Sequence, residues 1–165
     1  IVDDKDASIT IASINDDAYI ELLDSNGTAI GTGIGSLTVP ETISEEAAMT
    51  YTIKITGPSP YETYTQEYSL KLRAQSTDVT GIIYIDNEVL TLNEVSGFYE
   101  KKVIGQDHEL EAISTSSYAK VRIEGSTNEK NRELTVISLA SGQTEYYTVT
   151  IIAENGDEKD YIVEV

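Results

Sequence analysis

The alternation of apolar and polar residues at the end of the chain is the strongest constraint on the fold. In residues 147–151, tyrosine, valine and isoleucine alternate with threonine. A β-strand places successive side chains on opposite faces, so this pattern predicts one buried and one solvated face. Residues 161–165 alternate again, and Asn155-Gly156 between the two runs suits the positive φ angles of a tight turn. The chain is therefore predicted to end in an antiparallel hairpin.

The same pattern occurs a second time, earlier in the chain. Residues 50–55 match 147–151, residues 67–72 match 160–165, residues 36–39 match 133–136, residues 18–22 match 119–123, and Ile9 and Ile11 match Leu110 and Ala112. The offset between the copies falls from 101 (Ile9 to Leu110) to 93 (Tyr68 to Tyr161), so the loops differ in length while the strands are kept. A repeat of roughly 90 residues is long enough for each copy to form its own hydrophobic core.

Short strands at regular spacing predict an all-β fold of two tandem immunoglobulin-like antiparallel β-sandwiches. The predicted domains are residues 1–74 and 75–165. The second copy has two further predicted strands at its start, in residues 81–92 and 98–104. The first copy begins where the second of these strands ends, so it is expected to be N-terminally incomplete, with an irregular edge where a strand is missing. Pro40 and residues 41–48 give the one candidate for a short helical turn.

Charge and composition restrict the partners. The 165 residues carry a formal net charge of −18, which repels nucleic acid and anionic membranes and keeps a protein soluble. No apolar run is long enough to cross a membrane. Cysteine is absent, whereas a secreted eukaryotic sandwich of this size often carries a disulfide. With no initiator methionine and no signal peptide, the chain is expected to be a monomeric fragment of a larger multidomain protein.

Candidate catalytic chemistry is sparse. His108 is the only histidine, and no G-x-S-x-G motif presents a serine nucleophile. His108 is predicted to be solvated, at the point where a loop meets a strand. The glycine-rich residues 31–36 lack the spacing of a phosphate-binding loop, and they are predicted to form a flexible connection between strands. The sequence therefore predicts no enzyme, no catalytic residue and no cofactor.

Calcium is the one metal for which the sequence offers ligands. Calcium takes six to eight oxygen ligands, which often come from loops. Solvated acidic loops are the alternative reading of the same residues, and the junction between the copies offers only Asp78. The candidate ligands are Asp3, Asp4, Asp6, Asp16 and Asp17.

Two tyrosines offer a candidate ligand-binding site. Tyr61 and Tyr64 lie in a predicted loop, whereas Tyr68 is predicted to belong to the core because it matches Tyr161. Aromatic rings with nearby carboxylates can stack on sugars or contact a protein. Tryptophan, which a sugar-binding sandwich usually contains, is absent. These tyrosines are expected either to pack the loop or to bind a ligand, and in the second case the expected partner is an extracellular protein or a polysaccharide.

The second copy resembles the bacterial cadherin-like β-sandwich repeat, an immunoglobulin-like module found in tandem in secreted and cell-surface proteins. The residues that carry the resemblance are Tyr99, Ala112, Gly125 and the terminal segments 147–149, 153–156 and 159–165. Residues 79–165 are covered well and the first copy only loosely. The resemblance implies a structural or adhesive module, secreted or on a bacterial surface. Together with the missing cysteine, it favours a Gram-positive source. An accessory binding module attached to a secreted enzyme is the alternative.

Overall fold

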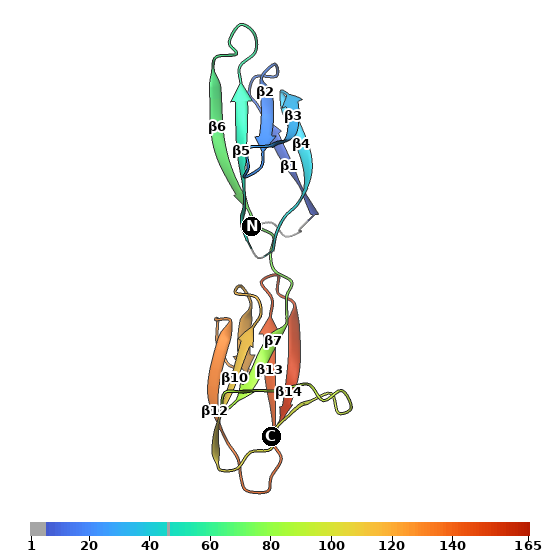
Figure 1. The fold of residues 1–165 in the computed structure, drawn as a ribbon, viewed down its shortest axis with the longest axis vertical. Helices are drawn as coiled ribbons and strands as arrows, with labels where there is room; N and C mark the ends of the chain where they lie inside the picture. Colours follow the sequence, from blue (N-terminus) through green and yellow to red (C-terminus); the bar gives the residue numbers. More distant parts are fainter. Residues whose placement is uncertain (1–5, 46) are drawn as a thin grey trace. The chain divides into compact units, whose positions relative to one another are not determined.

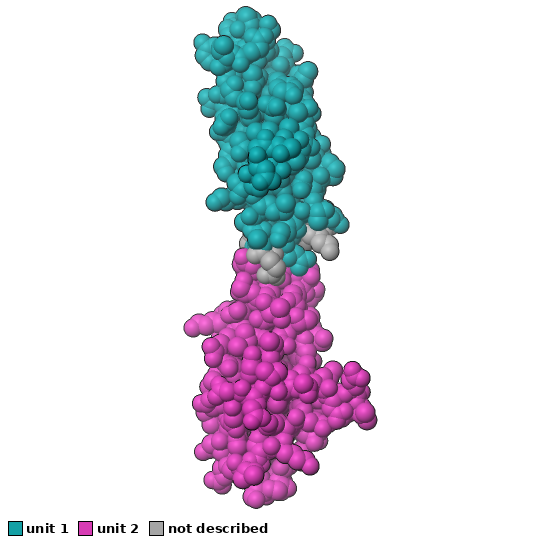
Figure 2. Space-filling view, in the orientation of Figure 1, with its two compact units in different colours: residues 1–75 teal, residues 76–165 magenta. Residues whose placement is uncertain are grey.

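The computed structural model describes residues 6–45 and 47–165, and it divides the chain into two compact units (Figure 2). Unit 1 comprises Ile1–Gln75 and unit 2 comprises Ser76–Val165. The division thus falls one residue after the predicted boundary. Every regular element within the described residues is a β-strand, which confirms the all-β prediction. In this part of the chain no helix is long and apolar enough to cross a membrane.

Unit 1 contains two antiparallel sheets (Figure 1). One has two strands, in the order β1-β4, and the other has four, in the order β3-β2-β5-β6. A core of its own lies in this unit, around Ile20, Leu22 and Tyr51. The strands are β1 (Asp6–Ala12), β2 (Tyr19–Leu23), β3 (Ala29–Ile34), β4 (Ser36–Thr42), β5 (Met49–Thr56) and β6 (Thr65–Leu72).

Unit 2 contains two four-stranded sheets, in the orders β12-β10-β7-β8 and β11-β13-β14-β9. All pairs are antiparallel except β14 with β9. The predicted terminal hairpin is the pair β13 and β14, with Gly156 at a φ of 95° in its turn. The strands are β7 (Gly81–Ile85), β8 (Glu88–Val89), β9 (Tyr99–Glu100), β10 (Asp107–Ser114), β11 (Lys120–Ile123), β12 (Arg132–Ser138), β13 (Tyr146–Ile152) and β14 (Glu158–Glu164).

The repeat relates five strands of unit 1 to five of unit 2. Strands β1, β2, β4, β5 and β6 correspond to β10, β11, β12, β13 and β14, because they pair in the same way. Strand β3 has no counterpart in unit 2. In the described part of unit 1, no strand corresponds to β7 or β9.

The alignment of residues 36–39 with 133–136 is wrong by one residue. Leu37 and Val39 are buried in unit 1, but Leu134 and Val136 are exposed. The buried residues of this region in unit 2 are Ile137 and Leu139. A shift of one residue moves every side chain of a strand to the other face. Both faces of this segment carry apolar residues, so the sequence pattern alone assigned the exposed face to the core.

The predicted helical turn at residues 41–48 is also wrong, because β4 continues through Pro40 to Thr42. Pro40 pairs with Ser8 of β1. The Ser13 N–H donates to the Gly35 carbonyl oxygen at 2.8 Å, so the odd-numbered residues of β4 make the hydrogen bonds to β1. The missing N–H of Pro40 therefore faces the far edge, where a strand tolerates proline.

The two predicted opening strands of the second copy are shorter than expected. The first ends at Ile85 and turns back into β8, and only Tyr99 and Glu100 of the second are strand. Asp86 and Asn87 form the turn, with φ of 50° and 66°. Two successive residues with positive φ make the tight turn of a two-residue hairpin, for which aspartate and asparagine are suited. The Asp-Asn pair was the sequence sign of this turn.

The glycine-rich residues 31–36 are not simply a connection, because Gly31 and Gly33 lie inside β3 and only Gly35 turns the chain, at a φ of 69°. A Cβ on Gly31 would lie 2.3 Å from a methyl group of Val39. A Cβ on Gly33 would lie 2.3 Å from the carbonyl oxygen of Ser36. The glycines therefore allow β3 to pass close to the start of β4.

We expect Gly33→Ala to lower the free energy of unfolding of unit 1 by about 1–3 kcal/mol, the usual range for overpacking. The obstructing atom belongs to the backbone, so it cannot move aside as a flexible side chain would. Denaturant unfolding, followed by hydrogen exchange to separate the two units, measures the change. Thr32→Ala on the exposed neighbouring position is the control, with an expected change within about 0.5 kcal/mol. Equal changes for the two variants would contradict the close approach.

Candidate functional site

Two exposed tyrosines lie in the loop that joins β5 to β6, residues 57–64, which we call the tyrosine loop (Figure 1). Tyr61 is 58% exposed and Tyr64 72% exposed. Their ring centroids are 6.2 Å apart, with the planes tilted by 49°, a spacing at which aromatic rings contact each other. The structure thus brings together the two tyrosines that the sequence singled out.

The backbone of the tyrosine loop is held by its own hydrogen bonds. The Gly57 N–H donates to the Tyr64 carbonyl oxygen at 2.9 Å, and the Tyr64 N–H donates to the Tyr61 carbonyl oxygen at 3.0 Å. A Cβ on Gly57 would lie 2.7 Å from the Tyr61 carbonyl oxygen, so glycine is needed for the loop to fold back. Hydrogen bonds from the Ser59 side chain and from the backbone lower the pKa of Glu62, which keeps this carboxylate ionised. The loop therefore presents two aromatic faces beside a negative charge.

Tyr68 does not belong to the core, contrary to the prediction, since it is 53% exposed. It lines a groove of about 800 Å³ that starts where the tyrosine loop ends. The pair Ile55 and Gln66 lies in this groove, and the next pair along the strands leads into the loop. We call this feature the β1 groove. Its lining residues are Ile11, Ala12, Ser13, Ile14, Asn15, Asp16, Asp17, Ile53, Ile55, Gln66 and Tyr68.

The calcium candidates are not gathered into one cluster. Asp3 and Asp4 lie outside the described residues. Asp6 starts β1 and accepts a hydrogen bond from the Thr42 hydroxyl at 3.2 Å, whereas Asp16 and Asp17 follow the other end of β1. The Asp17 N–H donates to the Asn15 side chain at 3.0 Å, a local turn contact. Among the described residues, no three acidic or histidine side chains are grouped so that they could hold a metal ion.

His108 is buried, so the prediction of a solvated side chain is wrong. It lies on the inward face of β10 and is only 7% exposed. The Glu109 N–H donates to one carboxylate oxygen of Asp86 at 2.9 Å, and Nδ1 of His108 lies 2.7 Å from the other. These contacts lower the pKa of Asp86. Nε2 of His108 has no hydrogen-bond partner in the described part of the chain, so this pair activates no hydroxyl nucleophile there.

The outer face of the β12-β10-β7-β8 sheet carries apolar side chains that sequence reasoning assigned to the core or did not single out. Leu134 and Val136 extend from β12, and Ile82 and Val89 from β7 and β8, all about half exposed or more. The register places Leu134 and Tyr84 on either side of Glu111. Glu111 is buried among them and ion-paired with Arg132. The face therefore combines these apolar side chains with the buried Glu111 and with the exposed Asp107 and Glu109 of β10.

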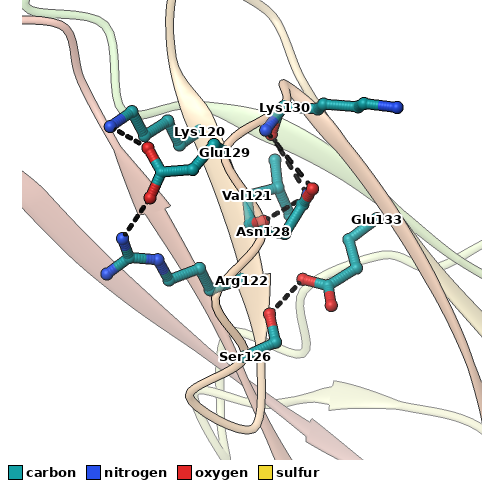
Figure 3. A network of polar contacts seen from close by, with 8 residues as sticks. All are labelled: Lys120, Val121, Arg122, Ser126, Asn128, Glu129, Lys130 and Glu133. Carbon is teal, nitrogen blue, oxygen red and sulfur yellow. Dashed lines mark hydrogen bonds and ion pairs between the residues drawn. The ribbon is translucent and has the colours of Figure 1, made fainter.

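A polar network holds the connection between β11 and β12 (Figure 3). The Asn128 side chain donates to the carbonyl oxygens of Val121, Lys130 and Arg132, at 2.8, 3.3 and 2.9 Å. Glu133 accepts a hydrogen bond from the Ile123 N–H at 2.8 Å. It also accepts one from the Ser126 hydroxyl at 2.7 Å, which Figure 3 shows. These contacts order the segment that takes the place of β3 in unit 2.

The charged side chains of the same connection pair with one another. Glu129 lies between Lys120 and Arg122, with Arg122 at 2.9 Å (Figure 3). Both cations lower the pKa of Glu129. The three side chains are 32–57% exposed, and exposed ion pairs of this kind contribute little to stability. We therefore assign the network a structural role in shaping the loop.

Comparison with known proteins identifies the fold. No protein-family model matches the chain, and no curated protein matches it. Among solved structures, the chain is similar to one described as "Structure of amphioxus IgVJ-C2 molecule", with a TM-score of 0.52 and 12% sequence identity. The match covers 100% of this chain and 99% of that chain. Together with the paired antiparallel sheets, this likeness shows that the chain has an immunoglobulin-like, two-sandwich fold.

Proposed function

We propose that the chain is a non-catalytic interaction module, a pair of immunoglobulin-like sandwiches that bind an extracellular partner through Tyr61 and Tyr64. One observation carries the proposal. The two rings are exposed, lie 6.2 Å apart and stand on a loop held by its own backbone hydrogen bonds. A preorganised aromatic pair loses little conformational entropy on binding, which is why tyrosine is enriched in binding surfaces.

The proposed setting is a bacterial protein that is secreted or held at the cell surface, with a Gram-positive source favoured. The resemblance of residues 147–165 to the cadherin-like repeat supports this, as do the tandem copies and the absence of cysteine. The net charge of −18 suits a soluble module that avoids nucleic acid and membrane insertion. In such a protein the chain acts as an adhesive or spacer segment of a larger multidomain molecule and works as a monomer.

A non-catalytic role is supported by the chemistry of the only histidine. His108 is buried against Asp86, with no hydroxyl hydrogen-bonded to Nε2 in the described part of the chain. We propose no cofactor. Calcium stays a proposal, and the binding measurement is therefore made with and without it. The proposed ligands are Asp3, Asp4, Asp6, Asp16 and Asp17.

The second candidate function is carbohydrate binding, as an accessory module attached to a secreted enzyme. The observation that favours it is the ionised Glu62, which lies between the two tyrosines in the sequence of the loop. Aromatic faces stack on sugar rings, and a carboxylate accepts hydrogen bonds from their hydroxyl groups. A polysaccharide ligand would favour this candidate over a protein partner.

We expect the 165-residue chain to bind a ligand in a panel of polysaccharides and host-matrix proteins, measured with calcium and with EDTA. Replacing both Tyr61 and Tyr64 by alanine should then weaken binding at least about thirtyfold. That factor corresponds to the roughly 2 kcal/mol of one hot-spot residue. A ligand that binds only in calcium would assign the acidic residues a role as well.

The matched control is Tyr146→Ala, which removes a tyrosine of similar exposure from unit 2. It should leave the affinity unchanged. Binding that survives the double substitution, or that Tyr146→Ala weakens equally, would remove the tyrosine loop from the proposal. No binding to any member of the panel would leave the spacer role as the function of the chain.

A further inference from the structure

In unit 2, strand β7 fills the space that is equivalent to the β1 groove of unit 1. Strand β7 pairs antiparallel with β10, with Ile83 opposite Ala112 and Ile85 opposite Leu110. Both isoleucines are fully buried in the core, together with Val149 and Ile151 of the facing sheet. A Cβ on Gly81 would lie 2.4 Å from Ile151. Strand β7 therefore covers the β13 side chains directly.

The corresponding side chains of unit 1 are uncovered within the described residues. Ile53 and Ile55 of β5 match Val149 and Ile151 of β13, yet they are only half-buried. Tyr161 donates from its hydroxyl group to the Val79 carbonyl oxygen at 2.7 Å, just before β7, whereas its equivalent Tyr68 is 53% exposed. The β1 groove thus occupies the place of β7.

One wall of the groove is a strand edge that pairs with nothing in the described part of unit 1. The hydrogen bond from the Ser13 N–H to Gly35 shows that the odd-numbered residues of β1 bond to β4. Thr10 and Ala12 therefore direct their backbone N–H and C=O groups into the groove side. In unit 2 the Thr115 N–H donates to the Thr80 carbonyl oxygen at 2.9 Å, and the Asp86 N–H donates to the Glu109 carbonyl oxygen at 2.9 Å. Thr115 and Glu109 match Ile14 and Ser8, which lie on either side of Thr10 and Ala12 along the same edge. Glu111 and Ile113, which match Thr10 and Ala12, pair with β7 between them.

We propose that the β1 groove binds an extended strand of a partner polypeptide, added antiparallel to β1. The pairing of β7 with β10 in unit 2 indicates which side chains the partner strand carries. The partner carries β-branched apolar residues at two alternate positions, opposite Ile9 and Ile11, and a small residue opposite Ser13. Main-chain hydrogen bonds to Thr10 and Ala12 supply affinity, and the alternate side chains supply selectivity, as in other cases of strand addition.

The charge of the groove further restricts the partner. Asp16 and Asp17 lie at the end of β1 where the N-terminal end of an antiparallel strand would arrive, and both are exposed. Unit 2 has Ser117 and Tyr118 at these positions. Among the residues that the structure describes, no lysine or arginine lines the groove. A partner strand with basic residues before its apolar positions complements this surface, whereas an acidic one is repelled.

A second copy of the chain is a poor donor, because its own β7 is buried in unit 2. The partner strand is therefore a polypeptide segment of the stated chemistry from outside these 165 residues. Tyr61 and Tyr64 do not line the β1 groove, so a negative result for one site leaves the proposal for the other unchanged.

A fluorescent peptide tests the proposal, with two lysines followed by the sequence of residues 79–86, Val-Thr-Gly-Ile-Ile-Tyr-Ile-Asp. We expect saturable one-to-one binding to the 165-residue chain, and slower hydrogen exchange at the Thr10 and Ala12 amides. A control peptide with aspartate in place of the second and third isoleucines should bind at least tenfold more weakly, because both side chains enter the groove. The Tyr61→Ala, Tyr64→Ala double variant should bind the peptide as the parent chain does.

Two variants of the chain separate strand addition from simple apolar adhesion. Ala12→Pro removes an N–H that faces the groove, and it should weaken binding at least tenfold. Thr38→Pro is its matched control, because Thr38 lies opposite Thr10 and directs its N–H to the far edge of β4. Tyr68→Asp, at an exposed lining position, should weaken binding similarly and does not depend on the backbone of β1.

Four results would overturn the proposal. The first is no saturable binding of the lysine-tagged peptide, and the second is protection of amides in unit 2 instead of β1. The third is an equal loss of binding in Ala12→Pro and Thr38→Pro. The fourth is a concentration-dependent dimer that protects Thr10 and Ala12 and that the peptide does not displace, since a second copy would then be the occupant.

Discussion

Replacing Ile151 by alanine is expected to lower the free energy of unfolding of unit 2 by about 2–5 kcal/mol, the range for truncation of a fully buried isoleucine. Ile55→Ala, at the equivalent position of unit 1, is expected to lower that of unit 1 by about 1 kcal/mol. Ile151 is 1% exposed beneath β7, whereas Ile55 is half-buried in the β1 groove. Alanine therefore leaves a cavity in unit 2 and removes a partly solvated side chain in unit 1.

Denaturant titration with hydrogen exchange at β10 and β2 assigns each change to its unit. Ile151→Val and Ile55→Val are the conservative controls, and Ile→Val in a packed core is expected to reduce stability by about 0.5–1.5 kcal/mol. Equal losses for the two alanine variants would mean that the floor of the groove is covered in solution. That result would also argue against a strand site at β1.

Introducing a charge at Ile137 is expected to prevent unit 2 from folding, with a loss of about 4 kcal/mol or more for Ile137→Asp. Val136→Asp, one residue earlier, is expected to lower stability by only about 1 kcal/mol, because aspartate is a poor strand former and would lie opposite Glu109. Ile137 is 4% exposed and faces the core, whereas Val136 is 61% exposed on the outer face of the sheet. A buried carboxylate without a partner must lose its hydration or its charge, and both are unfavourable.

Circular dichroism and thermal unfolding distinguish the two variants, and retention of the unit 1 transition shows that the effect is local. Ile137→Ala is the graded version, for which about 2–5 kcal/mol is expected. The reverse ranking, with Val136→Asp the severe change, would restore the alignment of residues 133–136 with 36–39. It would also place Leu134 in the core and remove the apolar outer face from unit 2.

The immunoglobulin-like fold could be predicted from the sequence because most strands have a local pattern of alternating apolar and polar residues. Threonine alternates with tyrosine, valine and isoleucine in residues 147–151, and the buried face follows from a period of two residues. Five strands of each copy were matched in this way, and the tandem arrangement followed. The turn at Gly156 and the exposed Tyr61 and Tyr64 were local features of the same kind.

Features that depend on distant segments were missed or reversed. His108, Leu110 and Ala112 share the inward face of β10. The ring of His108 is hydrogen-bonded there by Asp86, which is distant in the sequence. Tyr68 has the pattern of Tyr161, but its exposure depends on whether strands equivalent to β7 and β9 cover it. No local pattern reports the presence of a covering strand.

The sequence by itself determined where most strands and most turns are and that two copies of one sandwich follow each other, since these depend on neighbouring residues. Only the tertiary structure decided which face of β12 is buried. Residues 134 and 136 are as apolar as residues 137 and 139, so packing selects between the two faces. It also decided that β3 is a strand, because glycine at positions 31 and 33 has no pattern until β4 lies against it. The tertiary structure also decided that one edge of β1 is unpaired in the described part of unit 1, because an edge is unpaired only when no other strand lies beside it.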